Sequence, residues 1–372
     1  MSSYRSLDIP PSPVTVSVKI FDLIPAGQHK SVLAPAAGNL TPVLRGYERL
    51  ECPIFAFLIE HADLNRRVMF DLGLRKDMEN TAPSVRAILQ ENFPNTEKDI
   101  VDLLEESGIN VGSVDAIIWR DSHSHVDHTG DPSRFPASTD LVCSSELALD
   151  TFEQNPQSTL LPSDLAGHKH VKIDFSQSEL TLGDLRAHDY FGDGSFYLLD
   201  VPGHQAGHMC GLARVTSTPT TSFVLMGGDA CHHAGILRPT DAIYTNYPCL
   251  ANLLEATRRS VSTTHFPCPV AANETQTEFL LGLRSTPLLD IADGPYQADP
   301  ALARRSLAKL RVFDANLDVF VVMAHDASLL PLFTSDSEPV VINEWKKKGW
   351  KDEVVWAFLD EGNPAFRFRE KD

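Results

Sequence analysis

Apolar and polar residues alternate along much of the chain, and the pattern predicts a series of short strands. Between residues 14 and 23, valine and isoleucine alternate with polar residues, as in a half-buried β-strand. Apolar stretches at 53–60 and 67–72 flank a polar turn at 62–65, which predicts a β-hairpin. Later apolar runs predict buried strands at 114–119, 141–143, 171–175, 195–201, 209–215 and 223–226, and a late strand within 319–326.

Apolar residues at helical spacing separate these strands. The segment 85–93 follows Pro83, and proline is favoured at the start of a helix. A second predicted helix starts near residue 100 and ends at Gly108, since glycine is common just after a helix. We also expect a short helix from Ser145 and a longer one over 302–310. The chain therefore mixes strands and helices throughout.

One long segment shows neither the alternation of a strand nor the spacing of a helix. Residues 25–51 contain glycine, proline and asparagine in no clear pattern, which predicts a long loop. A loop of this length in a compact domain is usually functional or disordered. We expect a single domain over 1–372, with additions at 25–51, 235–300 and 335–372.

Composition limits the classes of partner. The formal net charge of −18 argues against a nucleic-acid groove, which needs clustered lysine and arginine. No apolar run approaches the length of a membrane span, and the N-terminus lacks a signal-peptide core. The 6 cysteines are scattered, which predicts reduced thiols and a cytoplasmic protein. The sequence carries no signal for the oligomeric state.

The most informative stretch follows the predicted strand at 114–119. His123, His125, Asp127 and His128 lie within six residues, too close together to share one helical face. On a loop leaving a strand, His123 and His125 can point one way while Asp127 and His128 point to a second position. This arrangement suits two adjacent divalent metals, and imidazole and carboxylate are ligands expected for zinc. The same ligand types also suit iron and manganese.

This pattern resembles the signature of the metallo-β-lactamase-fold hydrolases, and three later stretches resemble that family's other motifs in the same order. The Pro-Gly-His turn at 200–208, the strand ending in aspartate at 224–229 and the late strand ending in histidine at 319–326 complete the set. The resemblance implies an α+β fold, a four-layer α/β/β/α sandwich. It also implies two Zn²⁺ ions per chain, held by two ligand sets that share one residue: His123, His125 and His204; Asp127, His128 and His325; and Asp229 between them.

The resemblance also suggests the reaction. In the family, metal-bound hydroxide attacks a carbonyl carbon and the metals stabilise the oxyanion. We include Asp127 and His232 among the catalytic candidates. Lactonases of the family usually have a tyrosine where this chain has His232. Two roles for His232 are equally open: donation of a hydrogen bond or proton to the leaving group, and support of Asp229. His208 is expected to be a supporting residue, because the family's ligand directly follows Pro-Gly.

Three functions remain as hypotheses. The first is a dinuclear zinc hydrolase that opens a cyclic ester or amide of a small metabolite, similar to fungal lactonase-like members of the family. The second is a thioesterase acting on a glutathione, CoA or carrier-protein thioester. The third is a non-catalytic scaffold stabilised by metal. A small-molecule substrate, with no nucleic-acid or membrane partner, fits the first best.

Overall fold

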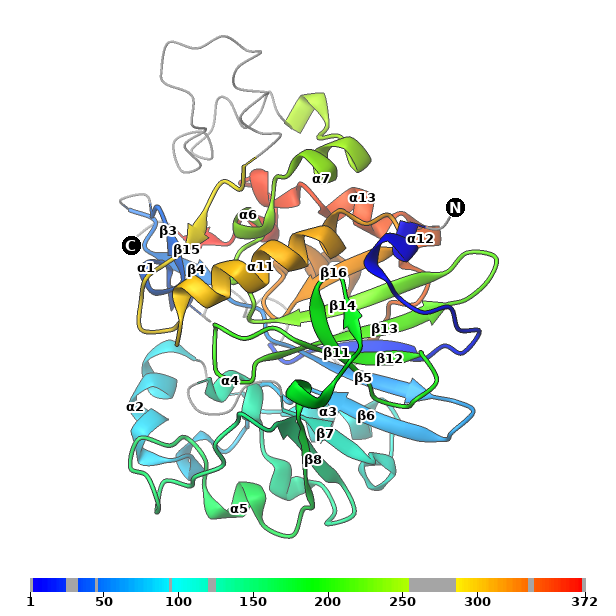
Figure 1. The fold of residues 1–372 in the computed structure, drawn as a ribbon. Coiled ribbons are helices and arrows are strands. Elements are labelled where there is room, and N and C mark those ends of the chain that lie inside the picture. The colour runs from blue at the N-terminus through cyan, green and yellow to red at the C-terminus, as the bar shows by residue number, and fades with distance from the viewer. Residues whose placement is uncertain are drawn as a thin grey trace.

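Two large β-sheets form the centre of the computed structural model (Figure 1), which describes residues 3–24, 33–43, 46–93, 96–119, 125–253, 286–333 and 338–369. The first sheet has the order β17 (Val340–Val341), β1 (Ser17–Asp22), β5 (Phe55–His61), β6 (Arg66–Phe70), β7 (Ala116–Ile118), β8 (Asp140–Ser144) and β9 (His170–Ile173). The second has the order β10 (Thr181–Leu182), β11 (Leu185–Asp189), β12 (Phe196–Asp200), β13 (Met209–Thr216), β14 (Ser222–Gly228) and β16 (Val319–Met323).

Both sheets combine antiparallel and parallel pairs. The predicted hairpin is confirmed, since β5 pairs antiparallel with β6 and Phe57 lies opposite Phe70. Strands β6 to β9 run parallel to one another, and β14 runs parallel to β16. Parallel neighbours need long crossover connections, which usually contain helices. The crossovers here contain α2 (Pro83–Asn92) and α3 (Ile100–Glu106) in the first sheet, and α6 (Ala234–Leu237), α7 (Asp241–Asn246) and α11 (Pro300–Ala315) in the second.

The sheets pack face to face and helices cover their outer faces. Phe57 and Phe70 of the first sheet share a buried cluster with Met226 and Phe320 of the second. Because successive strand residues point to opposite faces, Leu58 belongs to a different cluster, which also contains residues of α2, α3 and α11. Figure 1 shows α11 along one side of the sheets and α2 and α5 (Pro162–Leu165) on the other. The expected four-layer α/β/β/α sandwich is confirmed.

Several shorter elements were not foreseen. We expected a loop over 25–51, but its described residues include β2 (Leu33–Pro35), α1 (Ala36–Asn39), β3 (Leu40–Thr41) and β4 (Arg49–Glu51). These strands are too short to show a period, and they pair partly with strands much later in the chain, β15 (Asp290–Ile291) and β18 (Phe368–Arg369). Strands β10 and β11 were also not predicted.

Three of the four predicted helices are present in the structure, as α2, α3 and α11. Asp99 caps α3, and Gly108 follows it with a φ of 72°, as its predicted stop position requires. The helix expected from Ser145 is wrong, because a turn and irregular chain follow β8. Among the described residues, the other helices are α4 (Val126–Thr129), α12 (Trp345–Lys348) and α13 (Trp350–Val354). Turns of 3-10 type lie at Ser3–Leu7, Met78–Asn80, Val111–Ser113, Pro132–Arg134, Phe175–Gln177, Ala327–Leu332, Ala357–Leu359 and Pro364–Phe366. Within the described ranges, no helix has the length and apolar character needed to cross a bilayer.

Candidate metal centre

Residues of metal-ligand type gather where strands of both sheets end. Asp71 follows β6, and residues 125–128 lie on the connection that leaves β7. His204 follows β12, Asp229 follows β14 and His325 follows β16. Ligands of α/β proteins typically bind at the carboxyl ends of strands, because loops from several strands meet there. The sandwich therefore brings together residues that are up to 254 positions apart in the sequence, Asp71 and His325 being the extremes.

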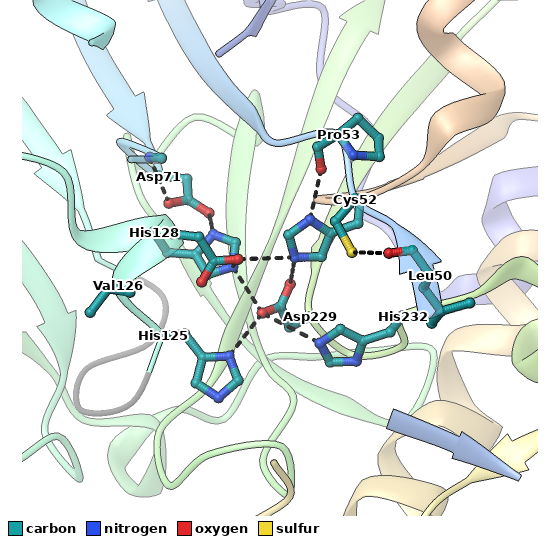
Figure 2. Close-up of polar contacts among 12 residues, drawn as sticks. Leu50, Cys52, Pro53, Asp71, His125, Val126, His128, Asp229 and His232 are labelled. Atoms are coloured by element: carbon teal, nitrogen blue, oxygen red, sulfur yellow. Dashed lines mark hydrogen bonds and ion pairs between the residues drawn. The ribbon is translucent and has the colours of Figure 1, made fainter. Parts of the chain in front are cut away.

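Asp229 lies at the centre of this group (Figure 2) and is completely buried. Its Oδ2 atom is 2.9 Å from Nε2 of His128, 3.4 Å from Nδ1 of His125 and 3.6 Å from Nε2 of His204. Its Oδ1 atom is 3.3 Å from Nε2 of His325. A single carboxylate therefore faces four imidazoles from three parts of the chain, as a bridging ligand does.

Asp127 is the second carboxylate of the group. Its Oδ2 atom is 3.5 Å from Nε2 of both His128 and His325. Its side chain is 14% exposed, whereas that of Asp229 is fully buried. Asp127 is therefore the carboxylate of the pair that solvent can reach.

The spacing of the donor atoms fits metal coordination. Two ligands about 2.0–2.1 Å from one zinc ion, at the tetrahedral angle, lie roughly 3.3 Å apart. Nδ1 of His125 and Nε2 of His204 are 3.3 Å apart, and the contacts of Asp229 lie close to this value. Three groups of potential ligands lie within 4.8 Å of one another: His125, His204, Asp229 and His232; His125, Asp127 and His128; and His128, Asp229 and His325. The residues present fit two adjacent metal positions that share Asp229.

Most of these imidazoles are anchored through the ring nitrogen that faces away from Asp229. Nδ1 of His128 is 2.7 Å from Oδ2 of Asp71, and Nδ1 of His325 is 2.7 Å from the carbonyl oxygen of Pro53. Nδ1 of His204 is 3.3 Å from Oε1 of Gln297. An acceptor at Nδ1 keeps the proton there and leaves the Nε2 lone pair for a metal.

His208 supports the centre without joining it, as expected. Its Nδ1 atom contacts the carbonyl oxygen of Val201, and its Nε2 atom accepts a hydrogen bond from the backbone N–H of Asp229 at 3.2 Å. The ring therefore links the turn after β12 to the end of β14. This contact fixes the backbone of the residue that all the imidazoles face.

Burial favours the neutral, metal-binding form of the histidines. Desolvation, with a further contribution from His125, lowers the pKa of His204 well below its ordinary value. Desolvation is also the largest cause of the lowered pKa of His232. A neutral imidazole has a free lone pair, so both rings are in the form that a metal requires.

Sequence reasoning found most of this group. The structure brings together six of the seven ligands expected from the sequence: His125, Asp127, His128, His204, Asp229 and His325. His232 lies in the same group. His123 lies outside the described residues. The sequence reasoning did not identify Asp71, Gln297 or the carbonyl of Pro53. Asp71 had a detectable signal, because it is an aspartate directly after an apolar run and before Leu-Gly. It has a φ of 72°, which is uncommon for a non-glycine residue.

Comparison with known proteins gives full-length relatives in fungi. No family model matches the chain. The chain is 36% identical to a gamma-lactamase of Fusarium pseudograminearum, over 98% of this chain and 87% of that protein. It is also 36% identical to a metallo-hydrolase of Annulohypoxylon moriforme, over 97% of this chain and 91% of that protein.

Other relatives are longer or more distant. The chain is 38% identical to a cytochrome P450 monooxygenase of Penicillium brevicompactum over 96% of its own length, but it spans only 38% of the length of that protein. Among solved structures, a quorum-quenching N-acyl homoserine lactone lactonase superposes with a TM-score of 0.52 at 16% identity. That superposition covers 88% of this chain and all of the lactonase, and it shows a common fold.

Proposed function

Because the chain belongs to the metallo-β-lactamase superfamily of metallo-hydrolases, we propose that it opens a cyclic amide or ester of a small metabolite with two metal ions. The observation that carries this proposal is the buried carboxylate of Asp229, which four imidazoles face at 2.9–3.6 Å. A structural metal site is normally closed around one ion. Two ligand groups sharing one carboxylate are instead typical of two-metal hydrolytic centres.

Zinc fits the donor set best. In our proposal His123, His125 and His204 hold one ion, while Asp127, His128 and His325 hold the other, and Asp229 belongs to both. When bound, such a pair supplies an activated water at neutral pH and polarises the carbonyl of the substrate. The described ligands include no thiolate, so the set consists of imidazole and carboxylate, which suit zinc without excluding iron or manganese on ligand type.

The protein's own groups position the reaction and handle its protons. Asp229, fully buried, fixes the spacing of the two ligand groups. Asp127 has partial solvent access, so its carboxylate can both bind at the centre and receive the proton that the attacking water loses. Asp71, Pro53 and Gln297 hold three imidazoles in the required tautomer.

A cyclic amide is the first choice of substrate class. The fungal relative aligned over 98% of this chain is named a gamma-lactamase, whereas the superposed solved structure is a lactonase with only 16% identity. In both lactams and lactones the carbonyl carbon is bonded to a heteroatom of the ring, so one centre suits either class of substrate. The amide reaction demands more help for its leaving group, because an amine anion leaves less readily than an alkoxide.

Metal analysis combined with a hydrolysis screen tests this proposal. The purified full chain should contain two metal ions and should hydrolyse γ-lactams or lactones faster than matched thioesters. Asp229→Asn nearly preserves the size of the side chain, so folding should be retained while turnover falls at least about 100-fold. Asp200→Asn is the control, because Asp200 ends β12 and belongs to none of the three ligand groups.

Three results would contradict the proposal. One metal ion per chain would remove the two-metal mechanism. Preferred hydrolysis of thioesters over both cyclic amides and lactones would support the thioesterase hypothesis instead. Bound metal with no hydrolysis of any of the three classes would favour the metal-stabilised scaffold.

A further inference from the structure

His232 occupies an unexpected position in the metal centre. It follows β14 by four residues, and its ring is almost completely buried. Its Nε2 atom points at Oδ2 of Asp229, at 3.8 Å, as Figure 2 shows. This is the oxygen that His125 and His204 also face. A residue dedicated to the leaving group is expected to point toward the substrate and not toward the shared ligand.

We propose that His232 is a ligand of the same metal as His125 and His204. This inference rests on the two-metal centre proposed above. The potential ligand atoms of His125, His204, Asp229 and His232 all lie within 4.8 Å of one another, so one ion can contact all four. His232 does not share a ligand group with His128 or His325, although its ring stacks on that of His325 at 5.8 Å.

The distances allow His232 and Asp229 to bind one metal ion. Ligands about 2.0–2.1 Å from a metal at angles between the tetrahedral angle and 180° are roughly 3.3–4.2 Å apart. The 3.8 Å between His232 and Asp229 falls inside this range. With His123 as the further ligand that the sequence implies, this metal would have five protein donors. Zinc accepts five-coordination, but protein sites more often provide four ligands or fewer.

The chain holds His232 in place through its C-terminal segment. The guanidinium group of Arg367 donates a hydrogen bond to the backbone carbonyl of His232. It also donates to the carbonyl of Glu51 at 2.6 Å and contacts Sγ of Cys52 at 3.1 Å. Arg367 is buried, and its backbone lies in the left-handed region with a φ of 63°. Arg367 is therefore a positioning residue that ties His232 to β4.

His232 differs from three of the other imidazoles in one respect. Its Nδ1 atom is buried and has no hydrogen-bond partner within the described part of the chain, whereas His128, His204 and His325 each have an acceptor there. An acceptor at Nδ1 raises the basicity of the ligand and fixes its orientation. We therefore expect His232 to bind the first metal more weakly than His204 does.

Cobalt substitution tests the role of His232 without measuring activity. The two metals of the full chain are replaced by Co²⁺, and the visible absorption spectrum is recorded together with competition against a chelator. His232→Ala should still bind two ions. Its absorption should become more intense, since the bands of Co²⁺ strengthen when its coordination number falls from five to four. Affinity at one site should fall by at least about 10-fold, because loss of a residue that only orients a ligand already costs about 10- to 100-fold. Added free imidazole should reverse the spectral change.

Three comparisons complete the design. His204→Ala should lose more affinity than His232→Ala, because His204 is the anchored ligand. Arg367→Lys should shift the spectrum in the same direction as His232→Ala but by less. His233→Gln is the matched control, since His233 contacts the carbonyl of Phe366 and the backbone of Gly235 and belongs to none of the three ligand groups. It should leave the spectrum unchanged.

The outcomes separate this inference from the proposed function. An unchanged spectrum and affinity in His232→Ala, with turnover reduced most for poor leaving groups, would overturn the ligand role and assign His232 to the leaving group. Binding of fewer than two ions by the unmodified chain would contradict the proposed centre itself. A fall in affinity without a spectral change would show that His232 only supports Asp229, and the ligand role would be wrong.

Discussion

Two buried carboxylates, Asp71 and Asp229, have different roles in the same centre. Burying an ionised carboxylate is costly unless it has partners. Asp229 has the imidazoles that converge on it, and it is placed to bridge two ions. Oδ2 of Asp71 contacts the far nitrogen of His128, and its Oδ1 accepts hydrogen bonds from the backbone N–H groups of Leu72 and Gly73, so Asp71 acts on the centre through the His128 ring. At the scale of single residues, the proposed centre therefore combines a carboxylate placed to bind metal with another that orients a proposed ligand.

Replacing Asp71 should weaken metal binding without removing a ligand. Asp71→Asn removes the charge that favours a proton on Nδ1 of His128, so the Nε2 lone pair becomes less available. We expect affinity for the metal held by His128 to fall about 10- to 100-fold, measured by competition with a chelator. Asp193→Asn is a matched control, because Asp193 forms an equivalent 2.7 Å contact with His61. His61 is the last residue of β5 and belongs to none of the three ligand groups. Equal losses in both variants would contradict the assigned role of Asp71.

At the scale of elements, the segment after β6 supports the loop that carries the ligands. The backbone N–H of Leu72 donates to the carbonyl of His128 at 3.2 Å, and the N–H of Gly130 donates to the carbonyl of Gly73 at 2.9 Å. Gly130 has a φ of 54°, and a Cβ atom there would lie 2.4 Å from that of Leu72. Only glycine allows the two segments to approach so closely.

Arg75 extends this support to a buried ionic network. Its guanidinium group is 3.2 Å from Asp164 of α5 and 3.5 Å from Asp131, three residues after His128. All three side chains are at most 9% exposed. Removing one partner of such a network leaves buried charges without compensation.

We expect Arg75→Leu to destabilise the protein by about 3–5 kcal/mol in chemical denaturation. Metal affinity should also fall, because the loop after β7 loses one of its attachments. The adjacent Lys76→Ala is the control, since Lys76 pairs with Asp102 at the surface and such pairs contribute at most about 1 kcal/mol. A loss for Arg75→Leu no larger than that of Lys76→Ala would show that the network is unimportant for stability.

At the scale of the whole molecule, the metal centre joins the two sheets at one edge. The N–H of Phe55, at the start of β5, donates to the carbonyl of Ala324 at the end of β16. His325 and Pro53 form a second contact between the same two places. The proposed ligands come from both sheets, so bound metal should hold the sheets together.

Metal removal should therefore lower thermal stability as well as activity. A ligand that binds only the native state stabilises it by about 2.7 kcal/mol at a concentration 100 times its Kd. Differential scanning calorimetry of the chelated protein should show a lower Tm, and zinc should restore it. An unchanged Tm after complete removal of metal would indicate that the sheets pack independently of the centre.

Acid should lower the free energy of unfolding of the metal-free protein, because its buried imidazoles become protonated on unfolding. Burial lowers the pKa of His204 in the folded state, so the unfolded chain binds the additional proton first as the pH falls. The free energy of unfolding should be constant above about pH 7 and decrease as the pH falls through the ordinary imidazole pKa of about 6.5. Denaturant titrations between pH 8 and pH 5 measure this slope. His204→Gln should reduce it, and an unaltered slope would exclude His204 as the cause.

The sequence determined the ligand types, most of the central strands and the order of the motifs. It could do so because the proposed ligands follow shortly after apolar runs, so that strand and ligand are read from one short stretch, as at 224–229. Only the tertiary structure decided the partners of those ligands. Asp71 and His128 meet because β6 and β7 are neighbours, and Arg367 reaches His232 from 135 residues away. The strands β2, β3 and β4 are too short for a period, and their pairing depends partly on chain segments hundreds of residues distant. Such contacts cannot be predicted from local sequence, because they arise only when packing of the two sheets brings their edges together.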